Sequence, residues 1–308
     1  MVNIKRLTFL ALQFISIYVA ADDAPFPETS LVRFNNRTLK TTSRLKAGYD
    51  LYAGRVFNVE AYGAVGNGIQ DNTQAFAIAW NVACKASKAV LLVPGKKIFQ
   101  INNSVFQGPC SPGFTFKIEG TITAPQDPAK WNNTNAVDFA NSSWITVAEL
   151  TITKSPSIHL TFNDCEFVRI RAVQIMSPAY SMNTDGIDIL TSKNFEVIDC
   201  VISTGDDCMA LGNGSSHILI RNLTCGPGHG ISIGSLGKFN SSAEVSTIHI
   251  DGAKLTETQN GVRIKTWQGG SGMISDIQFK NIEMVNVHNP IIIDQYYCAN
   301  TPNLCHNQ

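Results

Sequence analysis

The sequence predicts an all-β protein built as a right-handed parallel β-helix with an N-terminal capping helix. Short apolar segments with alternating side chains begin at intervals of 23 to 30 residues, and turns rich in Gly, Asn, Asp and Ser separate them. Repeats that stack only on their neighbours in this way form a solenoid. The segments are Phe167–Ile170, Phe195–Ile198, Ile218–Ile220, Ile248–Ile250 and Ile277–Phe279.

Each of the last four segments is followed by a second β-branched or apolar pair, so one repeat supplies at least two strands. A β-sandwich, the alternative, would show hairpin turns and antiparallel return strands. Here equivalent positions return once per repeat, which favours the solenoid. The pairs are Met209/Leu211, Ile231/Ile233, Val262/Ile264 and Ile291/Ile293.

The N-terminal end of the solenoid needs a cover, because a terminal coil otherwise exposes apolar edges. Residues 71–84 open with a polar cluster and are apolar at Phe76, Trp80 and Ala83. This pattern predicts an amphipathic helix, which we expect to cap that end.

The beginning of the chain predicts secretion. Lys5 and Arg6 precede a mostly apolar run over residues 7–19, and Ala20 and Ala21 follow, which is the layout of a cleavable signal. The run is too short to span a bilayer. We therefore predict a secreted, extracellular protein that acts at the cell wall.

We divide the chain into three segments. Residues 1–21 are predicted to be the signal peptide, residues 22–55 an extension without a clear period, and residues 56–308 the β-helix domain. Residues 291–308 contain no further repeat that would cover the C-terminal edge of the solenoid. We therefore expect the chain to self-associate through this edge and to have reduced activity. A fully capped solenoid would be a monomer.

The net charge excludes two classes of partner. The chain has 24 Lys and Arg residues and 24 Asp and Glu residues, and loss of Lys5 and Arg6 with the signal leaves 22 basic against 24 acidic groups. Nucleic acids and anionic membrane surfaces select a clear basic excess. We therefore predict no nucleic-acid partner and no membrane partner.

The eight cysteines are expected to form disulfides, because secretion places them in an oxidising compartment. They allow 105 full pairings, so the sequence alone does not assign them. From nearness and context we prefer Cys84–Cys110, Cys208–Cys225 and Cys298–Cys305, with Cys165 and Cys200 as buried free thiols. Seven glycosylation sequons fit an exported surface: Asn36, Asn102, Asn132, Asn141, Asn213, Asn222 and Asn240.

The candidate chemistry lies in short motifs between residues 183 and 297. Each motif alone is more often a turn or a solvated strand face. Together they bring three carboxylates, one histidine and two cations, which suggest acid/base cleavage of an acidic sugar polymer. The motifs are Asn183-Thr184-Asp185-Gly186, Gly205-Asp206-Asp207-Cys208, Gly228-His229-Gly230, Arg263-Ile264-Lys265 and Tyr297.

The repeat predicts that these side chains meet. Asp185, the pair Asp206 and Asp207, and His229 each precede a strand in successive repeats. Stacked strands lie about 4.8 Å apart, so equivalent positions should line one groove.

The two cations belong to the next repeat. Arg263 and Lys265 are two positions apart on a strand, so they should share one face while Val262 and Ile264 point into the core. Arginine pairs bidentately with carboxylates, which a polyuronate carries on every ring.

Three aspartates suit glycoside hydrolysis with inversion. One protonated carboxyl must serve the leaving oxygen, and an ionised carboxylate must hold a water on the opposite face. Crowded carboxylates cannot all ionise together, so one keeps its proton. His229 could hold that proton or bond the acid.

The same motifs resemble the polygalacturonase family of glycoside hydrolases, and its plant branch in particular. The resemblance extends over Gly228–Gly237, the Asp294–Cys298 segment and an N-terminal stretch, Phe57–Ala64, followed by Asp71. It implies a pectin-lyase-like β-helix that hydrolyses α-1,4-galacturonosidic bonds of polygalacturonate or pectin by inversion.

The resemblance also implies four catalytic roles and no metal or organic cofactor. Asp206 would be the general acid, Asp185 and Asp207 would activate the water, and His229 would support the protonation of the acid.

Four further positions would bind substrate. Arg263 and Lys265 would bind galacturonate carboxylates around the scissile bond, Asn183 would contact the sugar, and Tyr297 would shape the leaving-group side.

The chain departs from the family by joining Leu150–Ile152 almost directly to Ser155–Leu160, where relatives carry about two more coils, and by ending soon after Cys305. Two alternatives therefore stay open. One is a related rhamnogalacturonan hydrolase or pectate lyase, and the lyase would need calcium. The other is a catalytically silent, pectin-binding β-helix.

Overall fold

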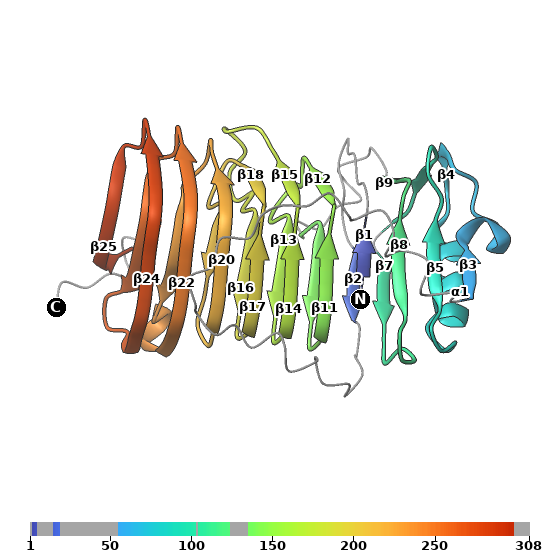
Figure 1. Ribbon diagram of the computed structural model, residues 1–308, viewed down its shortest axis with the longest axis horizontal. Helices are drawn as coiled ribbons and strands as arrows, with labels where there is room; N and C mark the ends of the chain where they lie inside the picture. Colours follow the sequence, from blue (N-terminus) through green and yellow to red (C-terminus); the bar gives the residue numbers. More distant parts are fainter. Residues whose placement is uncertain (1, 5–14, 19–54, 103, 124–134, 299–308) are drawn as a thin grey trace, which may run out of the picture.

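The structure is a computed structural model that describes residues 2–4, 15–18, 55–102, 104–123 and 135–298. These residues form a parallel β-solenoid whose coils stack along one long axis (Figure 1). Each strand pairs in parallel with the equivalent strand of the next coil. The predicted parallel β-helix is therefore confirmed.

One nine-stranded sheet runs along the solenoid and carries the candidate site. Its strands follow the order β7, β2, β10, β13, β16, β19, β21, β23, β25. They span Ser104–Gln107, Ile15–Tyr18, Val137–Ala140, Leu160–Asn163, Ile187–Leu190, Met209–Leu211, Ile231–Leu236, Asn260–Trp267 and Asn289–Tyr297 in that order.

A second sheet covers the other faces of the same coils. In the early coils a turn divides each coil's contribution into two strands: β11 (Ser143–Ala148) and β12 (Thr151–Thr153), β14 (Glu166–Arg171) and β15 (Gln174–Met176), and β17 (Lys193–Ile198) and β18 (Val201–Ser203). In the later coils they merge into the long strands β20 (Ser216–Cys225), β22 (Ser242–Thr256) and β24 (Ser271–Val285).

The N-terminal coils contain shorter strands in two smaller sheets, with orders β1-β8-β5-β3 and β4-β6-β9. Short 3-10 helices span Val59–Tyr62 and Lys238–Asn240. The strands are β1 (Val2–Ile4), β3 (Val56–Asn58), β4 (Asn67–Asp71), β5 (Val90–Val93), β6 (Ile98–Gln100), β8 (Thr115–Ile118) and β9 (Thr121–Thr123).

The predicted repeats stack in register. Their second elements also align, so both periodic signals report real strand pairings. The first series runs Val168, Phe195, Ile218, Ile248, Ile277. The second runs Met209, Ile231, Val262, Ile291.

The inward residues of these strands form one continuous core along the axis, with Phe139, Phe162 and Phe195 packed ring against ring. The core thins at β25, the last strand of its sheet, where Ile291 and Ile293 are each 72 % exposed. Self-association through this edge stays a prediction.

The predicted capping helix is confirmed as α1, Thr73–Ala83. It lies at the end of the solenoid opposite β25 (Figure 1). Trp80 is buried and packs against the rings of Phe106, Phe114 and Phe116. The helix starts two residues later than predicted, because β4 extends through Asp71.

The N-terminal strands differ from the expectation for this segment. β2 pairs with β7 and β10, and β1 pairs with β8, although both lie within residues 1–21. A short apolar, β-branched run suits a signal core as well as a strand, so composition does not separate the two. Cleavage of a signal peptide stays a prediction, which N-terminal sequencing of the mature protein would test. Residues 22–54 lie outside the described residues.

Two of the predicted disulfides are present, Cys84–Cys110 and Cys208–Cys225. Cys165 and Cys200 are buried free thiols, as predicted, and burial raises the pKa of each to about 11. They are therefore unreactive near neutral pH. The third predicted pair includes Cys305, which lies outside the described residues.

Four sequon asparagines, Asn141, Asn213, Asn222 and Asn240, are exposed, and Asn102 is partly buried. Their glycosylation stays a prediction, and Asn36 and Asn132 lie outside the described residues. In the described part of the chain, no helix has the length and apolar character needed to cross a bilayer.

Candidate active site

The solenoid brings the predicted carboxylates and histidine together at the starts of β16, β19 and β21. The backbone N–H of Gly186 donates to the carbonyl of Asp207 at 2.8 Å, and that of His229 donates to the carbonyl of Asp206 at 2.7 Å. These bonds connect turns of neighbouring coils. Asp185, Asp206, Asp207 and His229 therefore lie next to one another, as the repeat predicted.

Asp207 is buried, and both of its carboxylate oxygens accept hydrogen bonds. Arg263 Nη2 and Ser232 Oγ each donate to Oδ1 at 2.8 Å, and Lys265 Nζ donates to Oδ2 at 2.9 Å. Arg263 Nε also donates to Ser232 Oγ. Two cations and one hydroxyl thus hold Asp207 as a fixed anion on the floor of the site.

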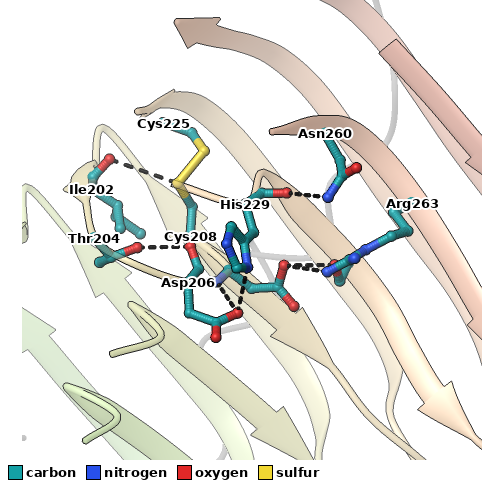
Figure 2. Close-up of a disulfide and its surroundings, with 10 residues drawn as sticks. Ile202, Thr204, Asp206, Cys208, Cys225, His229, Asn260 and Arg263 are labelled. Carbon is teal, nitrogen blue, oxygen red and sulfur yellow. Dashed lines mark hydrogen bonds and ion pairs between the residues drawn. A yellow bond between two sulfur atoms is a disulfide. The ribbon is translucent and has the colours of Figure 1, made fainter. Parts of the chain in front are cut away.

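Asp206 has a more open environment beside His229. His229 Nδ1 lies 2.9 Å from Asp206 Oδ1, and both side chains are partly exposed (Figure 2). Burial raises the pKa of Asp206, but the hydrogen bond and charge of His229 outweigh it, so the net pKa is lowered. The same bond raises the pKa of His229. The pair therefore shares one proton, which resides on the imidazole in the free protein.

Asp185 is a predicted catalytic carboxyl whose surroundings favour the protonated form. Burial, followed by the charges of Asp206 and Asp207, raises its pKa to about 7. Asp188, on β16 in the same cluster, has its pKa raised well above the ordinary value by burial and the neighbouring Asp185. Its Oδ1 has no hydrogen-bond partner among the described residues. The free site thus holds protonated and ionised carboxyls side by side.

The two predicted substrate cations share one face, as predicted, because both bind Asp207. Lys265 is only 7 % exposed there, and Ile264, which we expected in the core, is only partly buried. An irregular register between β23 and β25 beyond Lys265 departs from strict alternation. Both cations are bound to Asp207 before any substrate arrives.

The remaining two predicted residues lie on either side of this cluster. Asn183 is exposed in the loop before β16. The ring of Tyr297 lies 5.4 Å from Lys265 Nζ and packs edge-on against Trp267. Tyr297 therefore contacts the cationic side, whereas Asn183 lies on the opposite, N-terminal side.

Sequence reasoning missed His159, which is fully buried and supports Asp185. Its backbone N–H and its Nδ1 both lie 2.9 Å from the carbonyl of Asp185, and its Nε2 lies 2.8 Å from Ser177 Oγ. A carbonyl only accepts, so Nδ1 carries the proton and Nε2 accepts from Ser177. Burial lowers the pKa of His159 to about 4, which keeps the ring neutral. Its place just before β13, one repeat ahead of Asp185, was the available signal.

Two buried threonines were also missed. Thr184 Oγ1 accepts from the N–H of Gly205, and Thr204 Oγ1 donates to the carbonyl of Asp206. The Cys208–Cys225 disulfide anchors the strand that follows (Figure 2). These groups hold the backbone on which the carboxylates stand.

The donor set that best matches a metal site consists of Asp206, Asp207 and His229, whose ligand atoms lie within 4.8 Å of one another. Asp207 is already neutralised by Arg263 and Lys265, so a divalent ion would face two positive charges. The residues therefore fit acid/base chemistry better than cation binding.

Comparison with known proteins agrees with this geometry. Residues 127–307, more than half of the chain, match the family of glycosyl hydrolases family 28. A polygalacturonase of Chamaecyparis obtusa is 45% identical over 98% of this chain and 68% of its own length. A polygalacturonase of Malus domestica is 36% identical over 92% of this chain and 70% of its length.

Solved structures show the same fold. The endo-xylogalacturonan hydrolase of Aspergillus tubingensis superimposes with a TM-score of 0.71 at 20% identity, covering 81% of this chain and 79% of that chain. The polygalacturonase of Erwinia carotovora gives 0.61 at 21% identity, covering 86% and 84%.

The match to the Chamaecyparis protein extends over 353 residues, although this chain has 308. The relative therefore carries additional residues within the matched region, in agreement with the predicted internal shortening. With the family match, the relatives and the fold in agreement, the chain belongs to glycosyl hydrolases family 28.

Proposed function

We propose that this protein hydrolyses α-1,4-galacturonosidic bonds of polygalacturonate, the de-esterified form of pectin, with inversion. The observation that carries the proposal is the carboxylate cluster around Asp206, set beside two cations on one face of the solenoid. Acid/base cleavage needs the first feature, and a polymer with one carboxylate per ring favours the second. The polygalacturonase relatives support the same substrate.

Asp206 is the proposed proton donor, with His229 as its proton source. In the free protein the lowered pKa of Asp206 leaves the proton on His229. A bound polyuronate changes this balance, because its carboxylates raise the pKa of nearby acids and its rings displace water. Both effects favour the neutral pair, with the proton on Asp206 facing the leaving oxygen.

Asp185 and Asp207 are proposed to position and deprotonate the water. Asp207 supplies a carboxylate that Arg263 and Lys265 hold in position. Asp185, with a pKa of about 7, accepts a proton readily near neutral pH. The same raised pKa favours a rival assignment, in which Asp185 is the donor and Asp206 the base.

Two measurements separate these assignments. A galacturonide with a leaving group that needs no protonation should restore cleavage by the variant that lacks the acid. Azide should restore cleavage by the variant that lacks the base, with an inverted glycosyl azide as product. We expect Asp206→Asn to respond to the activated substrate and Asp185→Asn to azide. The reverse pattern would establish the rival.

The class of reaction is tested by incubating the full chain with polygalacturonate. We expect new reducing ends with inverted configuration, no absorbance from unsaturated products, and no loss of rate with a calcium chelator. Unsaturated products would identify a lyase, and binding without new reducing ends would identify a silent pectin-binding protein. Activity on rhamnogalacturonan alone would point to the other hydrolase.

The place of action follows from the substrate. We propose that the protein acts outside the cell at the plant cell wall, where pectin occurs, and that the active form is a monomer. N-terminal sequencing of the secreted product and light scattering test these two statements.

A further inference from the structure

A shallow pocket of about 540 Å³ lies on the N-terminal side of the carboxylate cluster. It has no counterpart among the predicted site residues except Asn183. Its lining comes from two loops, the one before β13 and the one before β16. The lining residues are Pro156, Ser157, Tyr180, Met182 and Asn183.

The pocket follows the carboxylates along the stacking direction of the coils. The loop before β13 leads to His159, whose N–H donates to the carbonyl of Asp185 in the next coil. The N–H of Gly186 then donates to the carbonyl of Asp207, one coil further. The pocket and Asp206 thus occupy equivalent points of neighbouring coils, within roughly 10 Å at two strand spacings. A polymer lying across Asp206 would place an adjacent ring in the pocket.

The chemistry of this pocket differs from that of the opposite side of the site. Tyr180 is 87% exposed and Met182 is 80% exposed, and none of the five lining residues carries a charge. On the opposite side, Lys265 contacts Tyr297, and Lys238 lies 5.2 Å from the ring of Trp267. The groove therefore has a cationic C-terminal side, whereas the pocket on its N-terminal side has an uncharged lining.

We infer that this pocket, lined by Tyr180 and Met182, is a binding subsite for a methyl-esterified galacturonosyl ring. The inference rests on the proposed function and names a substrate class that the catalytic cluster does not specify. The enzyme would cleave at a free galacturonate while holding an esterified neighbour.

Desolvation explains the preference. A uronate carboxylate that enters an uncharged pocket loses water without gaining a cation, whereas a methyl ester has no charge to desolvate. Its methyl group and the apolar face of the ring can cover Tyr180 and Met182, which otherwise expose their surface to water. Asp185, two residues from Asn183, would repel a carboxylate further when ionised.

The test compares Met182→Lys with the parent on polygalacturonate and on randomly, partly methyl-esterified pectin. A lysine would supply the missing cation, so the ratio of kcat/KM for polygalacturonate over esterified pectin should rise about fivefold, the size of one exposed charge pair. Met182→Gln, which is polar but neutral, should change the ratio much less. Mass spectrometry of the parent's products should place a methyl ester at one fixed position from the new chain end.

Two further variants test whether the effect is specific to a charge in the pocket. Met273→Lys adds the same charge at another exposed methionine, on β24 in the sheet that does not carry the site, and should leave the ratio unchanged. Lys154 is exposed two residues before Pro156, so Lys154→Met tests whether this lysine serves the pocket. A fall in the polygalacturonate preference of Lys154→Met would overturn the inference.

The outcomes separate the inference from the proposed function. If the parent cleaves polygalacturonate but Met182→Lys and Met273→Lys behave alike, the subsite is wrong and the hydrolase stands. Esters at random positions in the products would also contradict it. If the parent cleaves neither polymer, the proposed function itself fails.

Discussion

Asp206 and Asp207 are adjacent in sequence, yet they belong to two different parts of the site. Asp207 is on the buried floor, where Arg263, Lys265 and Ser232 use both of its oxygens. Asp206 is on the open wall, where its side chain pairs with His229 and water has access. Permanent charge and transferable protons need different surroundings, and the fold supplies both to neighbouring residues.

The largest effect is expected from substitution of Asp207, on the buried floor of the site. Asp207→Asn removes the anion that compensates two mostly buried cations, so we expect the free energy of unfolding to fall by about 3–5 kcal/mol. Hydrolysis should be lost as well, because Arg263 and Lys265 would lose their position. Chemical denaturation together with reducing-end release measures both.

A double variant sharpens this result. Asp207→Asn with Lys265→Met removes one unpaired cation and should recover part of the stability but none of the activity. A single Asp207→Asn variant as stable as the parent would show that the network is not the support we describe.

Substitution of Asp206, on the open wall of the site, should affect catalysis but not stability. Asp206→Asn keeps the shape and a bond to His229, so its free energy of unfolding should stay within about 0.5 kcal/mol of the parent. Its kcat should fall by about 10³-fold, within the range for loss of a general acid, while polygalacturonate binding persists. Single-turnover rates and equilibrium binding check the two parts. Activity within a few-fold of the parent would contradict the assignment.

His159 extends the comparison to the loop that carries Asp185. His159→Leu removes the ring N–H that donates to the Asp185 carbonyl, and a small displacement of the carboxyl should lower kcat by about 10²-fold with little change in KM. His159→Asn retains a donor near the position of Nδ1 and should recover much of the rate. Equal losses in both variants, matched by equal losses of stability, would mean that His159 only fills the core.

The pH dependence of stability tests the protonated carboxyl. The pKa of Asp185 is about 7 in the folded protein against an ordinary value of 3.8. The folded chain therefore binds more protons between these values, and the free energy of unfolding should fall as pH rises through this window, by up to roughly 4 kcal/mol. Denaturation at pH 4 and pH 7 measures the fall, and Asp185→Asn should reduce it.

His229 contributes with the same sign at higher pH. Its pKa is raised by Asp206, so its stabilisation is complete below the ordinary value of 6.5 and is lost as pH rises through the folded pKa. The lowered pKa of Asp206 preserves its own contribution until pH falls below 3.8. A parent whose stability rises steadily from pH 4 to pH 7 would contradict both shifts.

The smallest expected effect on catalysis concerns the disulfide that follows Asp207. Replacing Cys208 and Cys225 with alanine opens a loop of 17 residues and should cost about 3 kcal/mol, with some loss of kcat because Cys208 directly precedes β19 beside the site. The matched control is alanine at Cys84 and Cys110, far from the carboxylates. It should lower Tm while leaving kcat unchanged. Equal kcat values in the two variants would show that the disulfide serves stability alone.

The fold and the membership of the cluster could both be predicted from the repeat pattern of the sequence. Strand spacing and apolar alternation report local geometry, and a solenoid converts a constant repeat into a constant spatial offset. This is why the stacking of the Met209, Ile231 and Val262 strands, and the meeting of Asp185, Asp206 and His229, followed from periodicity.

The distribution of charge within the cluster, in contrast, depends on contacts that form only in the folded protein. The repeat predicted that Lys265 shares a face with Arg263, but only packing shows that Lys265 is buried against Asp207. The pKa shifts of Asp185 and Asp206 likewise depend on burial and on partners in other coils. The supporting role of His159 could not be predicted from the sequence, because it depends on a hydrogen bond to the Asp185 carbonyl in the next coil. Burial and hydrogen bonding between residues distant in sequence are not encoded in any local pattern, so they had to be read from the folded chain.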